Sequence, residues 1–161
     1  MPTISLELFI AAPPERCFDL ARDIDLHTRS VATTSERAVG GVMSGLIGPG
    51  DIVVWEAGHF GVRQRLTSHI THFDRPRSFT DEMVRGAFAA LRHVHEFAPV
   101  EGGTVMRDVL EYTAPLGPLG RLADWLFLER YMRRFLLERN SYLKRLAEAG
   151  DAAGGDDHVL G

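Results

Sequence analysis

Two histidines stand two residues apart in the stretch LRHVHEF, at His93 and His95. Alternate side chains of a β-strand point to the same face, so both imidazoles are expected to share a face with Leu91 and Phe97. Imidazole exchanges protons near neutral pH and binds divalent metal ions. The pattern therefore indicates a polar patch in a ligand cavity, a metal site, or a strand whose predicted register is wrong by one residue and whose histidines face water.

Two carboxylates are predicted to lie on the same inner face as the histidines. In the next strand Met106 and Leu110 mark the buried side, and alternation places Asp108 between them. Asp81 occupies the equivalent position in the preceding strand. Buried ionisable groups are costly unless they are paired, so we expect His–Asp contacts across neighbouring strands. The candidate catalytic residues are therefore His93, His95, Asp108 and Asp81.

The hairpin after the histidines sets which residues face each other. A two-residue turn at Gly102-Gly103 predicts that Phe97 lies opposite Asp108 and His95 opposite Leu110. His95 and Asp108 are then diagonal neighbours, which long side chains can bridge. We expect at least one of the two histidines within hydrogen-bonding reach of a carboxylate.

A metal site needs more than the two histidines. An HxH pair binds a divalent ion when a carboxylate completes the set of ligands. Asp108, Asp81 or the more distant His59 would have to converge on the pair, and no HExxH-like spacing supports this. We therefore expect no metal ion and no other cofactor, and keep the metal site as an alternative.

The surrounding chain is predicted to form an α+β domain. Residues 3–10 alternate as a strand, and Pro13 and Pro14 then open a short helix. From about residue 35 the pattern is typical of strands, and residues 117–149 form one long amphipathic helix. The sequence predicts a curved antiparallel sheet of six to seven strands wrapped around a helix from Leu119 to Ala147. Residues 1–149 make a single domain, and residues 150–161 are expected to be a disordered tail.

The long helix carries an apolar stripe that is predicted to cover the sheet. Its members recur every three or four residues: Trp125, Leu128, Met132, Phe135, Arg139, Tyr142 and Leu146. Phe127 and Tyr131 lie off this stripe, so they are buried either by loops of the same chain or by a second subunit. We expect a monomer or a homodimer.

The space between sheet and helix is the predicted ligand cavity. Its expected lining combines apolar walls with a few polar groups, the usual composition of ligand pockets. Trp55, which shares a strand face with Asp51 and Val53, belongs either to this lining or to the plain core. The predicted ligand-binding residues are Trp55, Asp81, Met83, His93, His95, Met106, Asp108, Leu110, Met132 and Phe135.

The bulk composition excludes several classes of protein. The 161 residues are 45% hydrophobic and 25% charged, with a net charge of −4, so nothing favours nucleic-acid binding. A single cysteine excludes an internal disulfide and a thiolate zinc cluster. The N-terminus lacks the pattern of a secretory signal, and no stretch has the ~18 apolar residues of a membrane span. We expect a cytoplasmic protein without an integral membrane segment.

The order of these elements resembles the START/polyketide-cyclase (SRPBCC) superfamily and its helix-grip fold. The resemblance rests on APPERCFDLARDI, GDIVVW, FDRPRSFTDEM, HVHEF, GGTVMRDVLEY and the helix after PLGPLG, spread over residues 3–148. It implies binding of a small hydrophobic or amphipathic ligand that is lipid- or polyketide-like. The alternatives are a cyclase-, dehydratase- or hydrolase-type enzyme with a His–Asp acid/base pair, and a non-catalytic interaction module. A hollow of about 300 Å³ or more favours the first two.

Overall fold

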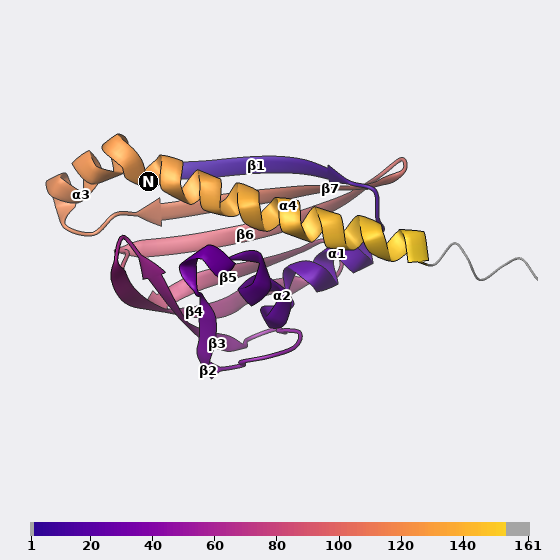
Figure 1. Cartoon of the computed structure of the whole chain (residues 1–161), viewed down its shortest axis with the longest axis horizontal. Coiled ribbons are helices and arrows are strands. Elements are labelled where there is room, and N and C mark those ends of the chain that lie inside the picture. Colours follow the sequence, from indigo (N-terminus) through magenta and orange to yellow (C-terminus); the bar gives the residue numbers. More distant parts are fainter. Residues whose placement is uncertain (1, 154–161) are drawn as a thin grey trace, which may run out of the picture.

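The computed structural model describes residues 2–153, and they form a seven-stranded antiparallel sheet with helices against one face (Figure 1). The strand order is β1-β7-β6-β5-β4-β3-β2. The strands are β1 (Thr3–Ile10), β2 (Arg37–Gly41), β3 (Ile52–His59), β4 (Val62–Asp74), β5 (Ser78–Arg85), β6 (Ala90–Val100) and β7 (Gly103–Thr113). The predicted α+β helix-grip architecture is confirmed.

The helices occupy two parts of the chain. Between β1 and β2 lie α1 (Pro14–Ala21), α2 (Ile24–Ser30) and the 3₁₀ turn η1 (Ala32–Thr34). After β7 follow α3 (Gly117–Ala123), the π-helical turn η2 (Asp124–Leu128) and α4 (Glu129–Ala153) without a break. Helix α4 extends beyond the expected domain end at residue 149, and the rest of the expected tail, residues 154–161, lies outside the described residues.

Local sequence explains how the first elements begin. Along β1 the residues from Ile4 to Ile10 alternate between inward apolar and outward side chains, as the period of a half-buried strand requires. Helix α1 starts at Pro14, whose missing N–H costs nothing in the first turn. The side chain of Asp23 caps α2 by accepting hydrogen bonds from the backbone N–H of Asp25 and Leu26.

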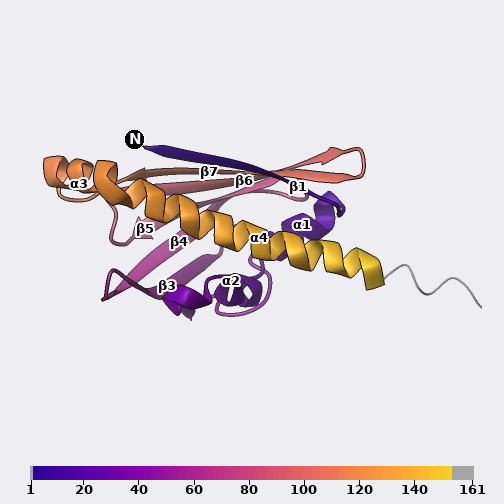
Figure 2. The same ribbon diagram turned by 45° about the horizontal axis from the view of Figure 1, so that its top comes forward.

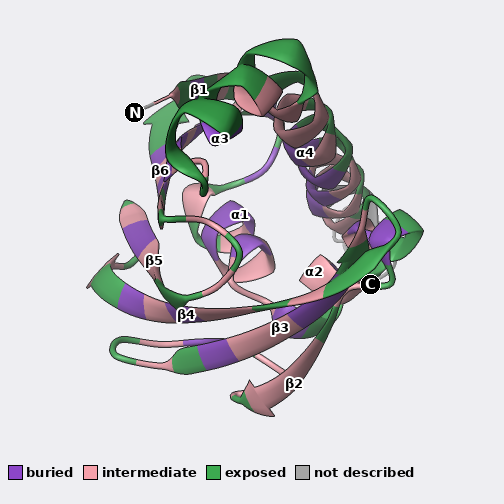
Figure 3. Ribbon diagram, turned by 90° about the vertical axis from the view of Figure 1, so that its left-hand side faces the viewer, coloured by how far each residue is buried: buried purple, intermediate pink, exposed green. Residues whose placement is uncertain are grey.

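Helix α4 runs diagonally across the concave face of the sheet (Figures 1 and 2). Viewed end-on, the strands curve from β1 round to β3, with α4 opposite β4 and with α1 and α2 between them (Figure 3). This arrangement follows from amphipathicity, because the inner faces of the strands and of α4 must be buried against each other. The inner residues of β5, β6 and β7 therefore face helices rather than water.

The core at the α1 end of the sheet is built around Phe18. Its ring centroid lies 5.3 Å from those of Phe73 and Phe79 and 5.5 Å from that of Phe97, all in edge-to-face geometry. Phe79 in turn stacks on the imidazole of His95 with a centroid distance of 4.2 Å. Aromatic packing thus connects α1 directly to the histidine pair.

The apolar stripe predicted for the C-terminal helix is only partly correct, because several of the most buried positions lie one residue further along. Trp125 is 80% exposed, whereas Met132 and Phe135 line the interior cavity. The most buried residues of α4 are Leu136, Arg139, Asn140, Leu143 and Ala147. The cause is the π turn at residues 124–128. A π turn adds one residue to a helical turn and so rotates everything after it relative to a regular 3.6-residue count.

The predicted hairpin register is also wrong, by two residues. Val100 pairs with Gly103, so the turn residues are Glu101 and Gly102, and His95 lies directly opposite Asp108. Gly102 adopts a φ of +80°, which glycine accepts without strain. Gly103 lies inside β7, where an added Cβ would sit 2.1 Å from the carbonyl oxygen of Ile10 on the neighbouring strand.

Candidate functional site

The two histidines and the two carboxylates meet on the inner face of β5, β6 and β7. Across β5 and β6, Asp81 pairs with His93, and across β6 and β7, His95 pairs with Asp108. His93, His95 and Asp108 are buried, and Asp81 is partly exposed. The predicted inward orientation of the histidines is observed, and the sheet register brings all four side chains into one cluster.

His95 lies between the two carboxylates. Its Nε2 donates a hydrogen bond of 3.1 Å to Asp81 Oδ2, and its Nδ1 lies 2.7 Å from Asp108 Oδ1. The predicted contact between a histidine and one of the aspartates is therefore present. An imidazole with a carboxylate at each ring nitrogen is well placed to carry a proton on both.

His93 and Asp108 form a second, looser contact. His93 Nε2 lies 3.2 Å from Asp108 Oδ1, and the two imidazole centroids are 3.9 Å apart. Although these distances suit ion pairs, His93 Nε2, His95 Nδ1 and Asp108 Oδ1 have no hydrogen bond of acceptable geometry among the described residues. One carboxylate oxygen thus faces two ring nitrogens without being aligned with either.

Helix α4 supplies the groups that hold Asp108. Asn140 Nδ2 donates a 2.5 Å hydrogen bond to Asp108 Oδ2, and Arg139 Nη1 lies 3.9 Å from the same oxygen. Arg139 also donates to the carbonyl oxygen of Ala21 and to Nδ1 of His27. The buried guanidinium is therefore fixed by several partners, and the cluster contains two carboxylates and one permanent positive charge.

The cluster shifts its members' pKa values in different directions. Burial disfavours the charged form of His95, but Asp108 and Asp81 outweigh burial and raise the pKa of His95 above its usual value. For His93, burial and the neighbouring His95 charge lower the pKa despite Asp108. Burial opposes ionisation of Asp108 as well, yet the two imidazoles hold its pKa well below the usual range. The arrangement therefore favours protonation of His95, which lies between two carboxylates, over protonation of His93.

This asymmetry predicts separate titrations of the two histidines. In an NMR pH titration with a chelator present, His95 should titrate above the ordinary histidine value of about 6.5, and His93 should titrate below it. Titration of His93 and His95 at the same pH would contradict the proposed charge arrangement.

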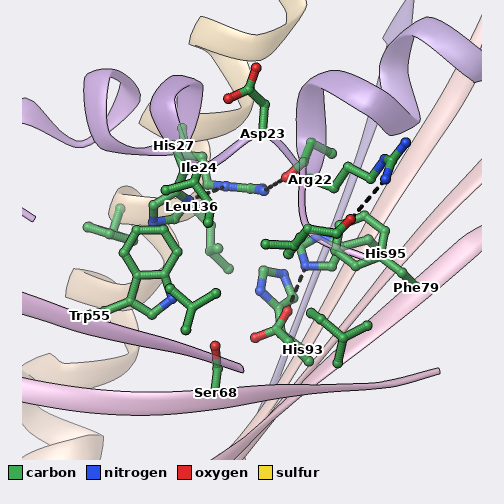
Figure 4. Close-up of a pocket in the computed structure, with 17 residues that line it drawn as sticks. Arg22, Asp23, Ile24, His27, Trp55, Ser68, Phe79, His93, His95 and Leu136 are labelled. Carbon is green, nitrogen blue, oxygen red and sulfur yellow. Dashed lines mark hydrogen bonds and ion pairs between the residues drawn. The ribbon is translucent and has the colours of Figure 1, made fainter. Parts of the chain in front are cut away.

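A cavity of about 470 Å³ opens beside the cluster. Its walls are largely apolar, and its polar lining residues include His27, Glu36, His59, Gln64, Asp81 and His93. The apolar lining includes Trp55, Phe60, Leu66, Phe88, Leu91, Leu110, Leu128, Met132, Phe135 and Leu136. A smaller hollow of about 100 Å³ adjoins it, lined by His27, Trp55, His93 and His95 among others (Figure 4).

The structure distributes the predicted ligand-binding residues unevenly. Those that line one or both hollows are Trp55, Asp81, His93, His95, Leu110, Met132 and Phe135. Met106 instead belongs to the core cluster around Phe18, and Met83 lies near Gly86. Asp108 is fully buried behind the histidines and is not part of the lining of either hollow.

Several residues of the site are not among the predicted ligand-binding residues. His59 lines the large cavity and its Nδ1 lies 2.5 Å from the hydroxyl of Tyr131, so it does not join the histidine pair. His27 also lines the cavity and contacts Glu36 through a 2.5 Å bond. Among the residues that support the site, Arg139 alone had a sequence signal, because it interrupts an otherwise apolar stripe.

Comparison with known proteins agrees with this fold. Residues 1–148 match the family described as polyketide cyclase / dehydrase and lipid transport, and the chain belongs to this family. None of the described helices is long and apolar enough to cross a lipid bilayer. A comparison with functionally curated proteins finds no sequence match.

Solved structures with the same fold cover almost the whole chain. The protein TTHA0849 from Thermus thermophilus is 22% identical, with a TM-score of 0.75 over 92% of this chain and 99% of the other. A START superfamily protein from Mycobacterium smegmatis is 13% identical, with a TM-score of 0.66 over 91% and 97%. Ginseng major latex-like protein 151 from Panax ginseng is 13% identical, with a TM-score of 0.63 over the same shares. These similarities show the helix-grip fold.

Proposed function

We propose that this protein binds a small hydrophobic or amphipathic molecule, lipid- or polyketide-like, in the cavity between the sheet and the C-terminal helix. The observation that carries the proposal is the cavity of about 470 Å³ with largely apolar walls and a few polar groups, among them Asp81 and His93. Ligand sites of small molecules are typically hollows of roughly 300–1,000 Å³ with this composition. The apolar body of the ligand lies against the walls, and its polar group meets His93 and Asp81.

Membership of a family described by cyclase, dehydrase and lipid-transport functions supports the same class of ligand. A cyclase-, dehydratase- or hydrolase-type activity is the second candidate, because His93 and Asp81 both reach the cavity wall. Binding is common to the two, and it is therefore the function to test first. Native mass spectrometry of the purified protein would reveal a co-purified small molecule.

Filling the cavity tests the proposal directly. Ala123 of α3 lines the cavity, and Ala123→Phe should lower the affinity for the amphipathic probe 1-anilinonaphthalene-8-sulfonate about tenfold, or about 1.4 kcal/mol. The probe's fluorescence measures binding, and a fatty acid should displace it. The effect is expected because the added ring takes the space of the ligand's apolar part.

The matched control is Ala149→Phe, which adds the same ring at an exposed position on α4. It should leave probe affinity unchanged. Equal affinities for wild type and Ala123→Phe, or no displacement by the fatty acid, would place the probe outside the cavity and contradict the proposal.

A further inference from the structure

We propose that Asp81, His93 and His95 bind one divalent transition-metal ion of the zinc or ferrous type, at the part of the cavity wall that Asp81 and His93 line. One donor atom from each residue lies within 4.8 Å of the other two. Asp81 Oδ2 and His95 Nε2 are 3.1 Å apart. Two ligands held about 2.1 Å from one ion at angles near 90–110° are about 3.0–3.4 Å apart, so this pair already has the required spacing.

The positions of the three residues are set by the sheet. Asp81 and His93 are direct cross-strand partners on β5 and β6, and His95 follows on the same face of β6. Strands hold side chains more firmly than loops do, which favours a defined coordination geometry. The sequence contains the HxH pair, but the convergence of a carboxylate on it becomes visible in the fold.

Asp108 supplies the second layer of such a site. Its Oδ1 faces Nδ1 of His95 and Nε2 of His93, which leaves the other nitrogen of each ring for the ion. A carboxylate behind a ligating imidazole fixes the ring's tautomer and increases its basicity. Asn140 and Arg139 in turn fix Asp108. At 2.7 and 3.2 Å from the two rings, Asp108 occupies the place where metal-binding histidines usually have a carboxylate.

Charge and donor type agree with a divalent transition metal. The two carboxylates and the guanidinium of Arg139 sum to one negative charge before the imidazoles are counted, and this attracts a cation. Two imidazoles and one carboxylate suit zinc or ferrous iron, whereas magnesium and calcium favour oxygen ligands.

The remaining coordination positions face the ligand. Asp81 and His93 belong to the lining of the large cavity, so a bound ion would meet a carbonyl or carboxylate oxygen of the molecule inside it. Three protein ligands with open positions are typical of catalytic and substrate-binding metal sites, whereas structural sites are closed by four. The inference goes beyond the proposed binding function, which does not require a metal.

The test uses tag-free protein that has been treated with a chelator, at pH 7.5. Titration with Co²⁺ is monitored by visible absorption, and titration with Zn²⁺ is monitored by calorimetry. We expect one equivalent to bind. Asp81→Asn and His95→Gln should each weaken binding at least tenfold, and Asp108→Asn should weaken it about 10–100-fold without changing the stoichiometry. His72→Gln, which removes an exposed histidine of β4 outside the cluster, should have no effect.

Circular dichroism shows which variants are folded. If His95→Gln does not fold, the metal affinity of Asp81→Asn decides the test, because Asp81 is partly exposed and asparagine has nearly the same shape. Less than one equivalent in the wild type, or unchanged affinity in folded Asp81→Asn, would overturn the metal site. Probe binding is measured in parallel with a chelator present. If the protein binds the probe but does not bind the metal ion, the metal site is contradicted and the proposed ligand binding in the cavity is not.

Discussion

Replacing Asp108 with alanine should cost about 3–5 kcal/mol of the free energy of unfolding, the range for removing one partner of a buried ion pair. Asp108 is fully buried, with His95 Nδ1 at 2.7 Å and Asn140 Nδ2 at 2.5 Å from its oxygens. Without the carboxylate, the Asn140 amide would lose its acceptor and both imidazoles would lose the negative charge that faces them, in a place that water does not reach. Urea unfolding of wild type and variant measures the difference.

Two further variants separate charge from packing. Asp108→Asn keeps the shape of the side chain but removes the charge, and it should lower the pKa of His95 because Asp108 is the main group that favours the imidazolium. Asp74→Ala removes a solvent-accessible carboxylate paired with Arg77 and should cost much less, because exposed ion pairs contribute little to stability. If Asp108→Ala is no more costly than Asp74→Ala, the buried pair does not exist as described.

Phe18→Ala should also destabilise the fold by about 3–5 kcal/mol, the usual cost of deleting a buried aromatic ring. Phe18 is fully buried and contacts three other aromatic rings, including Phe79. The cavity left by the ring would loosen Phe79, which stacks on His95. We therefore expect lower stability in urea unfolding together with a changed His95 signal in NMR spectra.

Phe9→Ala is the matched control, because Phe9 on β1 is 44% exposed and lies beside Lys144. Its loss should cost about 1 kcal/mol or less. Phe18→Leu, which keeps most of the apolar volume, should fall between the two. A similar cost for the Phe9 and Phe18 variants would show that the aromatic cluster does not anchor α1 to the sheet.

Alternation in single strands was enough to predict the inner face of the site. In β7, Met106 and Leu110 define a buried side that must include Asp108, and in β6, Phe97 does the same for His93 and His95. These inferences hold because side chains repeat every two residues in a strand whatever lies around it. The start of α1 at Pro14 is also local, because the fixed φ and missing N–H of proline suit the first helical turn whatever lies around it.

The pairing between elements depended on contacts that are distant in the sequence. Either glycine of the Gly102-Gly103 pair could serve a tight turn by composition, and the backbone of Ile10 is what requires glycine at position 103. That choice moves His95 opposite Asp108. Periodicity alone likewise did not reveal the π turn that rotates α4, so Trp125 is exposed and Asn140 faces inward.

The sequence by itself therefore determined the helix-grip fold, the family and the four ionisable residues on the inner face. The tertiary structure decided how those residues meet: Asp81 and Asp108 on either side of His95, with Arg139 and Asn140 behind. It also decided which apolar residues enclose a cavity and which, like Met106, fill the core. The physical reason is that periodicity fixes the direction of a side chain within its own element, whereas register and helix rotation are fixed by packing between elements far apart in the chain.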